Sequence, residues 1–305
     1  MPRWARITLT IVLLLLIAAG GGYFWFIGDG NPPGTLPTYS LDMAAVRAKA
    51  EELPGGKASE VRVEKVATFT FPAVAAVGGD GWNGLPMAAF SYQLILPTDT
   101  IVIDSAFNAA QGASLGAKID DDAYARMDIA LAGATEIVVT HEHPDHIGGI
   151  IAYSDPAGIR RALRLTKEQV DSLPKFGLAW PAALTDYAPL EYDGMLTIAP
   201  GVVLIRAPGH TPGSQMVFVK REDGRELLFI GDIGWSLRNV ETGKGRPRLL
   251  SQFMLSEDRD AVFAELATLK ALHAAEPDLL IVPGHDVAAV DALVAAGAMT
   301  PEFRR

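Results

Sequence analysis

The sequence predicts an α/β domain that follows an N-terminal transmembrane helix. Short apolar runs typical of buried strands alternate with helical segments after residue 60, and a long uncharged segment precedes them. With 305 residues, of which 49% are hydrophobic, the chain is long enough for one large domain. The net charge of -10 argues against nucleic acid as a partner, because a polyanion calls for a basic surface.

The first predicted element is the uncharged segment Ile7–Ile27, which two arginines precede. At about 1.5 Å per residue, a helix of this length spans the roughly 30 Å hydrocarbon core of a bilayer. The arginines favour a cytoplasmic N-terminus, which puts the rest of the chain on the extracytoplasmic side. A cleaved signal peptide is the alternative, with Ala18 and Gly20 as the small residues before the cut. We therefore interpret residues 1–28 as a membrane anchor or a signal segment, and either one exports the domain.

Residues 29–60 begin with a Gly/Pro-rich run and are predicted to form a stem with one short helix. Ser40 is the expected N-cap of that helix, and Pro54 with the glycines after it ends the helix. The main domain is predicted to occupy residues 61–305. Its first strand is "VRVEKVATFTF", and "SYQLILPTDTIVID" is typical of a hairpin that turns at Pro97–Thr100. The Gly-rich stretch between them predicts an irregular loop at the mouth of a site.

The remaining elements alternate between helix and strand. We expect a helix from about Asp121 to Ala132 and a short buried strand in "ATEIVVT". Three strands follow in "TIAPGVVLIRAPGH", "SQMVFVK" and "ELLFIGD", and then an amphipathic helix from about Glu257 to Ala275. The last strand is "DLLIVPGHD", before a short C-terminal helix. This alternation predicts β-sheets covered by helices.

The motif "THEHPDHIGG", residues 140–149, holds three of the six histidines in the chain. His141 and His143 lie two residues apart at the end of a predicted strand, so both imidazoles point to the same side. Asp145 and His146 follow a proline at which a helix begins, so they face the same place from its first turn. Packing offers no reason to crowd three imidazoles, whereas neutral imidazole and carboxylate are natural ligands of a divalent cation.

One metal ion would leave ligands over, and three further residues complete the pattern. His210 in "APGHTPGS", Asp232 in "FIGDIGW" and His285 in "IVPGHD" each come just after an apolar strand, where loops gather at one edge of a sheet. His273 lies inside a predicted amphipathic helix and is interpreted as a solvated or half-buried helix residue. The predicted metal-binding residues are therefore His141, His143, Asp145, His146, His210, Asp232 and His285.

This ordered set, H-x-H-x-D-H followed by isolated His, Asp and His, resembles the signature of the metallo-β-lactamase superfamily. The resemblance covers the chain from about Val61 onward. It implies a four-layer αββα sandwich with the metals at one edge of its two sheets. It also implies one zinc ion held by His141, His143 and His210, a second held by Asp145, His146 and His285, and a bridging Asp232.

In this family two zinc ions about 3.5–4 Å apart share a hydroxide whose pKa is brought towards neutrality. By resemblance, Asp145 and Asp232 are the catalytic residues, and Asp145 is suited to steer the proton of the nucleophile. Zinc is favoured over iron because His143 stands where the di-iron branch carries Glu. Other divalent transition metals are also compatible with nitrogen and oxygen ligands.

Four neighbouring residues have less specific interpretations. Asp104 closes the strand "TIVID" and is expected either to accept a hydrogen bond from a ligand imidazole or to serve only as a turn carboxylate. Glu142 alternates away from the ligands, which predicts a solvated or salt-bridged side chain. Thr140 and Thr211 are expected to donate hydrogen bonds beside the ligands or only to shape turns.

The resemblance is to the esterase and lactonase branch, and it implies hydrolysis of an ester, lactone or related acyl bond in a small molecule. True β-lactamases use a Cys at the second zinc, which this cysteine-free chain excludes, or lack an Asp at the position of Asp232. Acyl-homoserine lactonases carry a Tyr three residues after the bridging Asp, where this chain has Trp235. Five aromatic residues are interpreted as pocket lining or as core and rim packing: Phe71, Trp82, Phe90, Trp180 and Trp235.

Two alternatives stay open at this stage. The first is a phosphodiesterase or nuclease of the same fold, and the second is a non-catalytic metal-binding scaffold. The expected partners are a small-molecule substrate and the membrane, through the N-terminal helix. The sequence indicates no nucleic-acid partner and no particular protein partner.

Overall fold

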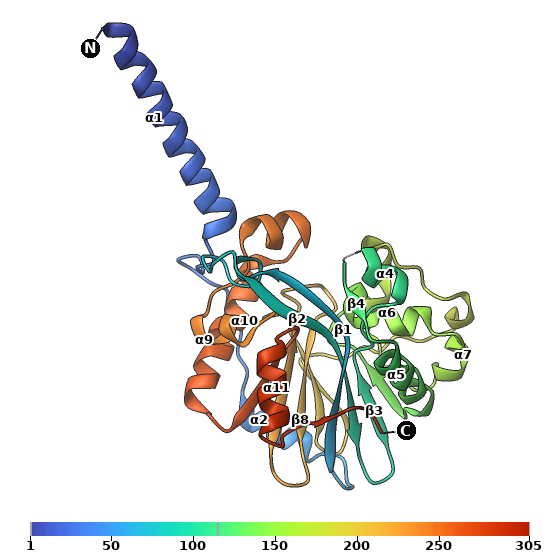
Figure 1. The fold of residues 1–305 in the computed structure, drawn as a ribbon. Helices are drawn as coiled ribbons and strands as arrows, with labels where there is room; N and C mark the ends of the chain where they lie inside the picture. Colours follow the sequence, from blue (N-terminus) through green and yellow to red (C-terminus); the bar gives the residue numbers. More distant parts are fainter. Residues whose placement is uncertain (1, 115, 305) are drawn as a thin grey trace.

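Two β-sheets that pack face to face form the centre of the computed structural model, which describes residues 2–114 and 116–304 (Figure 1). The first sheet has the strand order β11-β1-β2-β3-β5 with β4 paired to β1, and the second has the order β10-β9-β8-β7-β6. The first-sheet strands are β1 Glu60–Pro72, β2 Gly84–Ile95, β3 Thr100–Ile103, β4 Lys118–Ile119, β5 Glu136–Val138 and β11 Thr300–Pro301. The second-sheet strands are β6 Met195–Ala199, β7 Val202–Arg206, β8 Gln215–Lys220, β9 Glu226–Gly231 and β10 Leu279–Pro283.

Helices cover the outer face of each sheet. In the first half of the domain the helices are α3 Ala73–Ala76, α4 Ala109–Ser114, α5 Asp121–Gly133, α6 Pro144–Ala152, α7 Pro156–Ile159, α8 Lys167–Ser172, η2 Leu173–Phe176 and η3 Ala182–Leu184. In the second half they are α9 Leu237–Thr242, η4 Leu249–Met254, α10 Arg259–Ala275 and α11 Val287–Ala295. Before the domain come α1 Arg3–Tyr23, η1 Phe24–Gly28 and α2 Met43–Ala50.

Three buried apolar clusters hold these layers together. One cluster, which includes Phe229, lies between the two sheets. A second, with Ile147 of α6, lies between the first sheet and its helices, and a third, with Phe263 of α10, lies between the second sheet and its helices. Each fully buried side chain of this size contributes roughly 1.5–3 kcal/mol relative to an exposed one. The arrangement is the four-layer αββα sandwich that the resemblance implied, and the prediction of the fold is confirmed.

Two predicted helix starts lie slightly too early, and both errors concern the capping residue. Asp42, not Ser40, caps α2, because its Oδ1 accepts hydrogen bonds from the backbone N–H groups of Ala44 and Ala45 at 2.9 and 3.3 Å. The sequence pattern also includes Glu257 in the later amphipathic helix, but Asp258 is the N-cap of α10. The Asp258 carboxylate accepts a hydrogen bond from the backbone N–H of Ala261 at 3.1 Å. Glu257 therefore lies outside α10.

The stretch expected to be an irregular loop before the hairpin contains the first half of a strand. Residues 84–95 form β2, which pairs with β1 from Gly84 opposite Pro72 to Ile95 opposite Glu60. The residues in the middle of β2 are buried on both faces of the sheet. A strand buried on both faces shows no polar alternation, which is why its sequence lacks the usual strand pattern.

The N-terminal helix extends away from the sandwich (Figure 1). Residues 3–28 are long and apolar enough to cross a membrane, by length and composition, with a mean hydropathy of 2.2 over an 18-residue window of which no part is buried in the protein. The predicted stem after it is packed against the domain at several points. Gly245 N donates to Gly30 O at 2.9 Å, and Tyr39 Oη donates to Arg206 O at 2.9 Å.

Glu265 of α10 holds the loop before His210 through a buried hydrogen bond. Its Oε1 accepts from Gly209 N at 3.0 Å. Burial raises the pKa of Glu265 from 4.5 to about 8. Between these values the folded state keeps a proton that the unfolded state has lost. The contribution to stability is therefore complete below about pH 4.5 and is lost as the pH rises through about 8, at roughly 1.4 kcal/mol per pH unit.

We expect Glu265→Gln to remove this dependence, because the amide keeps an acceptor oxygen for Gly209 and does not titrate. The free energy of unfolding in detergent, measured by denaturant titration at several pH values, should fall less steeply for the variant than for the wild type. The exposed Glu241→Gln is the matched control and should keep the wild-type slope. Equal slopes for all three proteins would contradict a protonated Glu265.

Candidate metal centre

The motif loop and helix α6 bring four of the predicted residues to one sheet edge. His141 and His143 lie in the loop after β5, and Asp145 and His146 lie in the first turn of α6. Gly149 allows α6 to pack closely on the loop after β3, since a Cβ at this position would lie 2.4 Å from Ser105 O. The sequence-based prediction of a helix that begins at the proline and faces the strand end is thus confirmed.

The first donor cluster consists of His141, His143, His210 and Asp232, whose nearest nitrogen and oxygen atoms all lie within 4.8 Å of one another. His143 Nδ1 lies 3.0 Å from His141 Nε2 and 2.9 Å from His210 Nε2. Asp232 Oδ2 lies 3.5 Å from His210 Nε2 and 3.8 Å from His141 Nε2. Three imidazoles and one carboxylate therefore converge from three separate loops.

The second donor cluster consists of Asp145, His146, His285 and again Asp232. Asp232 Oδ1 lies 3.2 Å from His285 Nε2 and 3.4 Å from His146 Nε2. Asp145 Oδ2 lies 3.3 Å from His285 Nε2. All seven predicted residues are thus brought together, and the Asp232 carboxylate is common to both clusters.

The chemistry of these donors fits divalent cations. Within residues 2–114 and 116–304, His146 Nε2 and Asp232 Oδ1 are buried without a hydrogen-bond partner, although buried polar atoms are normally paired. Burial lowers the pKa of His143 to about 3, and burial with the neighbouring His146 lowers the pKa of His141, so both are neutral. Burial also opposes a charge on His285, but Asp232 and Asp145 outweigh it and raise its pKa to about 9. The two carboxylates of the second cluster therefore favour a bound cation.

In three of the histidines Nδ1 forms a hydrogen bond, so Nε2 is the nitrogen that faces the cluster. His146 Nδ1 lies 2.9 Å from Asp104 Oδ2, His210 Nδ1 lies 2.6 Å from Glu257 Oε1, and His285 Nδ1 lies 2.8 Å from Ala88 O. Such partners fix the tautomer and orientation of an imidazole.

Asp104 does more than complete a turn. It also accepts from Thr140 N at 2.6 Å and from Thr140 Oγ1 at 2.9 Å. Its backbone is left-handed, with φ of 60°, a conformation that costs a non-glycine residue energy and is found mainly where surrounding contacts enforce it. The hypothesis of a hydrogen bond from a histidine of the motif to Asp104 is therefore confirmed, and Thr140 supports the same carboxylate.

The prediction of a solvated or salt-bridged Glu142 is wrong. Its side chain is buried, Oε2 accepts from Thr211 Oγ1 at 2.8 Å, and Oε1 accepts from Gly213 N at 3.2 Å. The alternation of side chains along the motif correctly predicts that Glu142 points away from the donor clusters. The side chain nevertheless meets the loop after His210 instead of water, so it ties the two histidine loops together.

Sequence reasoning missed two charged residues. Glu257 fits the pattern of a helix, but it lies before the cap of α10 and contacts His210. Arg246 is fully buried, donates from Nη2 to Asp232 O at 2.7 Å, and forms an ion pair with Glu257. Nothing in the local sequence around either residue indicates these contacts, because each depends on how distant loops meet.

The five aromatic residues have different surroundings. Phe90 is buried between the sheets, Trp180 packs half-buried on Tyr187, and Trp82 is exposed. Trp235 donates its indole N–H to Asp232 Oδ2 at 2.6 Å and stacks on Phe71, with ring centroids 6.2 Å apart. The prediction for His273 is confirmed, since this residue is half-buried on α10.

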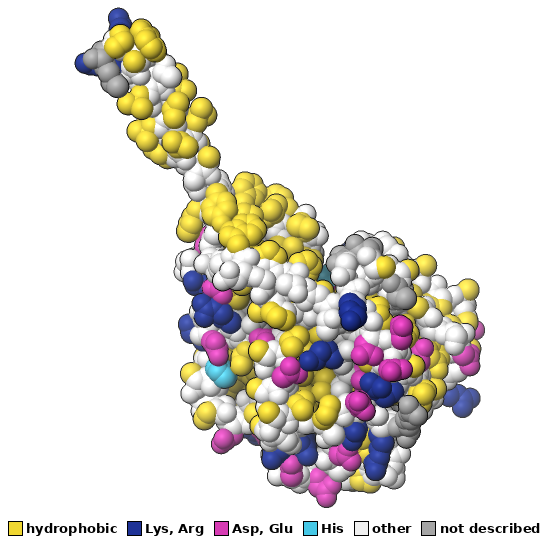
Figure 2. Space-filling model, viewed as in Figure 1, with side chains coloured by type: hydrophobic (Ala, Val, Ile, Leu, Met, Phe, Trp, Pro, Cys, Tyr) yellow, Lys and Arg dark blue, Asp and Glu magenta, His cyan; other side chains and the backbone are white. Residues whose placement is uncertain are grey.

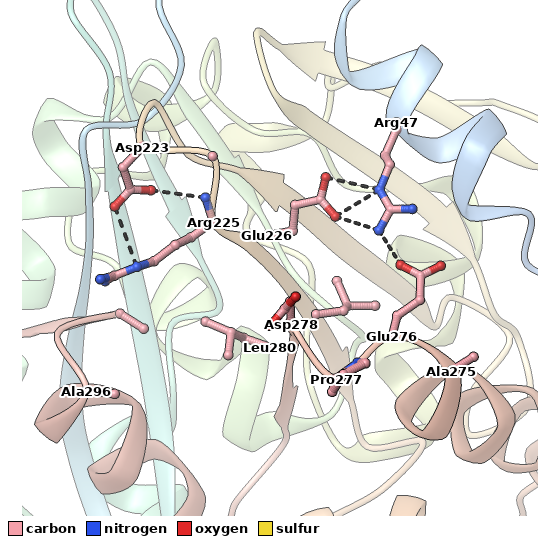
Figure 3. Close-up of a pocket in the computed structure, with 13 residues that line it drawn as sticks. Arg47, Asp223, Arg225, Glu226, Ala275, Glu276, Pro277, Asp278, Leu280 and Ala296 are labelled. Atoms are coloured by element: carbon pink, nitrogen blue, oxygen red, sulfur yellow. Dashed lines mark hydrogen bonds and ion pairs between the residues drawn. The ribbon is translucent and has the colours of Figure 1, made fainter.

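A wide surface cavity of about 780 Å³ lies at the opposite edge of the second sheet (Figure 3). Its lining includes the first residues of β9 and β10, whereas Asp232 and His285 follow the carboxyl ends of these parallel strands. Arg47 Nη2 lies 2.7 Å from Glu226 Oε2 and also forms an ion pair with Glu276. The cavity contains none of the seven predicted ligands, so it is separate from the donor clusters.

An αββα sandwich with histidine and aspartate clusters at one edge defines the metallohydrolase class, and comparisons with known proteins agree. Residues 86–285 match the model of the metallo-beta-lactamase superfamily, and the chain belongs to that superfamily.

Two kinds of relatives are similar to parts of the chain. The N-acyl homoserine lactonase AiiA of Bacillus thuringiensis subsp. kurstaki is 28% identical over 106 residues, which are 34% of this chain and 40% of that protein. The crystal structure of a quorum-quenching N-acyl homoserine lactone lactonase has a TM-score of 0.61 and 16% identity, over 78% of this chain and 97% of that one. The crystal structure of the hydrolase AbOPH has a TM-score of 0.53 and 18% identity, over 77% of this chain and 91% of that one. The two structures share the fold, and the matched segment spans less than half of the lactonase AiiA.

We expect the zinc-loaded full-length protein in detergent to hold about two metal ions per chain, as its two donor clusters suggest. His210→Ala and His285→Ala should each lower the content to about one, because each removes a donor from one cluster only. His273→Ala is the matched control and should retain the full content. Mass spectrometry of metals after gel filtration measures this, and unchanged content in all three variants would contradict the assignment.

Glu257→Gln should weaken zinc binding about 10–100-fold at the cluster that contains His210, because a neutral amide orients and polarises the imidazole less well. Competition with a zinc chelator measures the two affinities separately. The exposed Glu222→Gln serves as the control for loss of one negative charge. Wild-type affinities at both clusters in Glu257→Gln would show that this carboxylate is dispensable.

Proposed function

We propose that this protein is a di-zinc hydrolase that cleaves an ester, lactone or related acyl bond of a small molecule. The observation that carries the proposal is the pair of donor clusters that share Asp232 at the edge of the sandwich. In this proposal His141, His143 and His210 would hold the first zinc ion, and Asp145, His146 and His285 would hold the second. Asp232 belongs to both clusters and would contribute to both sites.

When bound, the two ions supply an activated water and Lewis-acid polarisation of the scissile carbonyl. The protein's own groups prepare the site for this. Trp235 and the backbone contact of Arg246 hold Asp232 in place, and Asp104 and Glu257 orient His146 and His210.

Asp145 is the proposed proton carrier. Its side chain is 20% exposed, the largest exposed fraction among the side chains of the second cluster, so it is the most accessible of them to solvent. Burial alone would raise its pKa, but the adjacent His146 and the hydrogen bond with His285 lower that pKa to about 2. The group is therefore a carboxylate at neutral pH and is able to accept a hydrogen bond from the attacking water.

Aromatic side chains around the clusters support an apolar acyl substrate. The ring of Phe176 lies 4.4 Å from His143, and Phe69 and Trp235 lie 5.5 and 5.9 Å from His285, between ring centroids. The relatives that carry the name N-acyl homoserine lactonase support the same substrate class. Trp235 differs from the Tyr expected in such lactonases and cannot act as a phenol, so the proposal extends to esters as well as lactones.

We further propose that residues 1–28 anchor the enzyme and that the domain of residues 61–305 acts outside the cytoplasm, joined by residues 29–60. The support is the length and composition of α1, with arginines only at its N-terminal end. The proposed partners are a small-molecule substrate and the bilayer.

A panel of chromogenic esters, acyl lactones, nitrocefin and bis-p-nitrophenyl phosphate tests the proposed reaction. We expect the zinc-loaded protein to hydrolyse esters or lactones, and we expect His141→Ala or chelation to abolish turnover while His273→Ala retains it. Activity confined to the phosphodiester would favour the phosphodiesterase alternative. Tight zinc binding without turnover on any substrate would favour a scaffold, and an active metal-free protein would overturn the proposal.

A further inference from the structure

The apolar N-terminal helix touches the domain through its last aromatic residues. Trp25 and Phe26, in η1, both contact Phe253 of η4, with ring centroids 6.5 and 5.7 Å apart. Nearby, Trp82 Nε1 donates to Tyr23 Oη at 2.9 Å. The end of the helix and η4 therefore form one continuous aromatic surface.

The part of η4 beside this contact exposes large apolar side chains. Leu249, Phe253 and Met254 are 41%, 60% and 68% exposed, and we call these three residues the η4 patch. Figure 2 shows hydrophobic side chains gathered at the foot of α1, where the helix joins the domain. Contiguous apolar surface of this kind marks a place where a protein meets another apolar phase.

The position of the η4 patch beside the end of α1 indicates that this apolar phase is a lipid bilayer. The uncharged segment from Ile7 to Ile27 is about 31 Å long as a helix, close to the thickness of a bilayer core. With α1 across a bilayer, Trp25 and Phe26 lie in the interfacial region, where Trp and Tyr are enriched. Because Phe253 contacts both rings, it lies at the same depth.

The connection between α1 and the domain holds the patch in this position. Gly30 O accepts from Gly245 N at 2.9 Å, and Arg259 Nη2 donates to Asp29 O at 3.2 Å. Arg248 lies 3.6 Å from the Asp29 carboxylate and 5.1 Å from the Trp25 ring centroid. A Cβ at Gly30 would lie 2.5 Å from Gly78 O, so only glycine permits this close approach.

We propose that the η4 patch is a second membrane-contacting surface, which inserts into the boundary between headgroups and acyl chains beside α1. The occupant is the lipid bilayer, because the patch continues the surface of the proposed spanning helix at interfacial depth. The η4 patch consists of apolar side chains, so the contact depends on apolar insertion and should persist in uncharged phosphatidylcholine. The proposal rests on α1 crossing a bilayer and not on the reaction catalysed.

The absence of cysteine from the chain permits a direct test of depth. Full-length Phe253→Cys, Leu14→Cys and Ile129→Cys proteins are labelled with the fluorophore NBD and placed in phosphatidylcholine nanodiscs with and without nitroxide-labelled lipid. Ile129 on α5 is the matched control, since it is 52% exposed and α5 lies away from α1 (Figure 1). We expect nitroxide lipid to quench the labels at positions 253 and 14 and to leave the label at 129 unquenched.

Quenching at position 14 without quenching at position 253 would overturn the proposal, because the domain would then stand off the bilayer. A label at 253 with blue-shifted but unquenched emission would also overturn it and would indicate that a second copy of the chain covers the patch. An unquenched label at position 14 would remove the spanning helix on which the proposal depends. The zinc content and turnover of the same labelled proteins are measured separately, so failure of the proposed hydrolase would not be mistaken for any of these results.

Discussion

The buried carboxylate of Asp232 is the constraint on which the rest of the site depends. Moving a carboxylate out of water costs several kcal/mol unless opposite charge or hydrogen bonds compensate it. Here Oδ2 accepts the indole N–H of Trp235, while Oδ1 faces the Nε2 atoms of His146 and His285. Because this one side chain belongs to both donor clusters, the clusters form a single centre and cannot be positioned independently.

Carboxylates in loops beside the two sheets orient this centre. On the side of the first sheet, Asp104 joins Thr140 to His146. On the side of the second, Glu257 before α10 joins His210 to Arg246. Each histidine that meets a carboxylate through Nδ1 presents its other nitrogen to the cluster. The loops that carry these carboxylates thus determine which nitrogen atoms are available for chemistry.

The segment that joins α1 to the domain is also close to the donor clusters. Gly245 forms a hydrogen bond with Gly30, and the next residue, Arg246, donates to Asp232 O and pairs with Glu257. One short loop therefore contacts both the N-terminal linker and the site.

The sequence by itself determined the α/β class, the apolar N-terminal helix and the seven residues of the two clusters, because periodicity and strand-end position are local properties. Family resemblance added the four-layer sandwich. Only the tertiary structure decided that Glu142 is buried, that Glu257 lies outside α10 and that Arg246 reaches Asp232. The partner of a buried polar group is chosen by the loops that meet around it, and Glu257 lies 47 residues from His210. No local pattern carries that information.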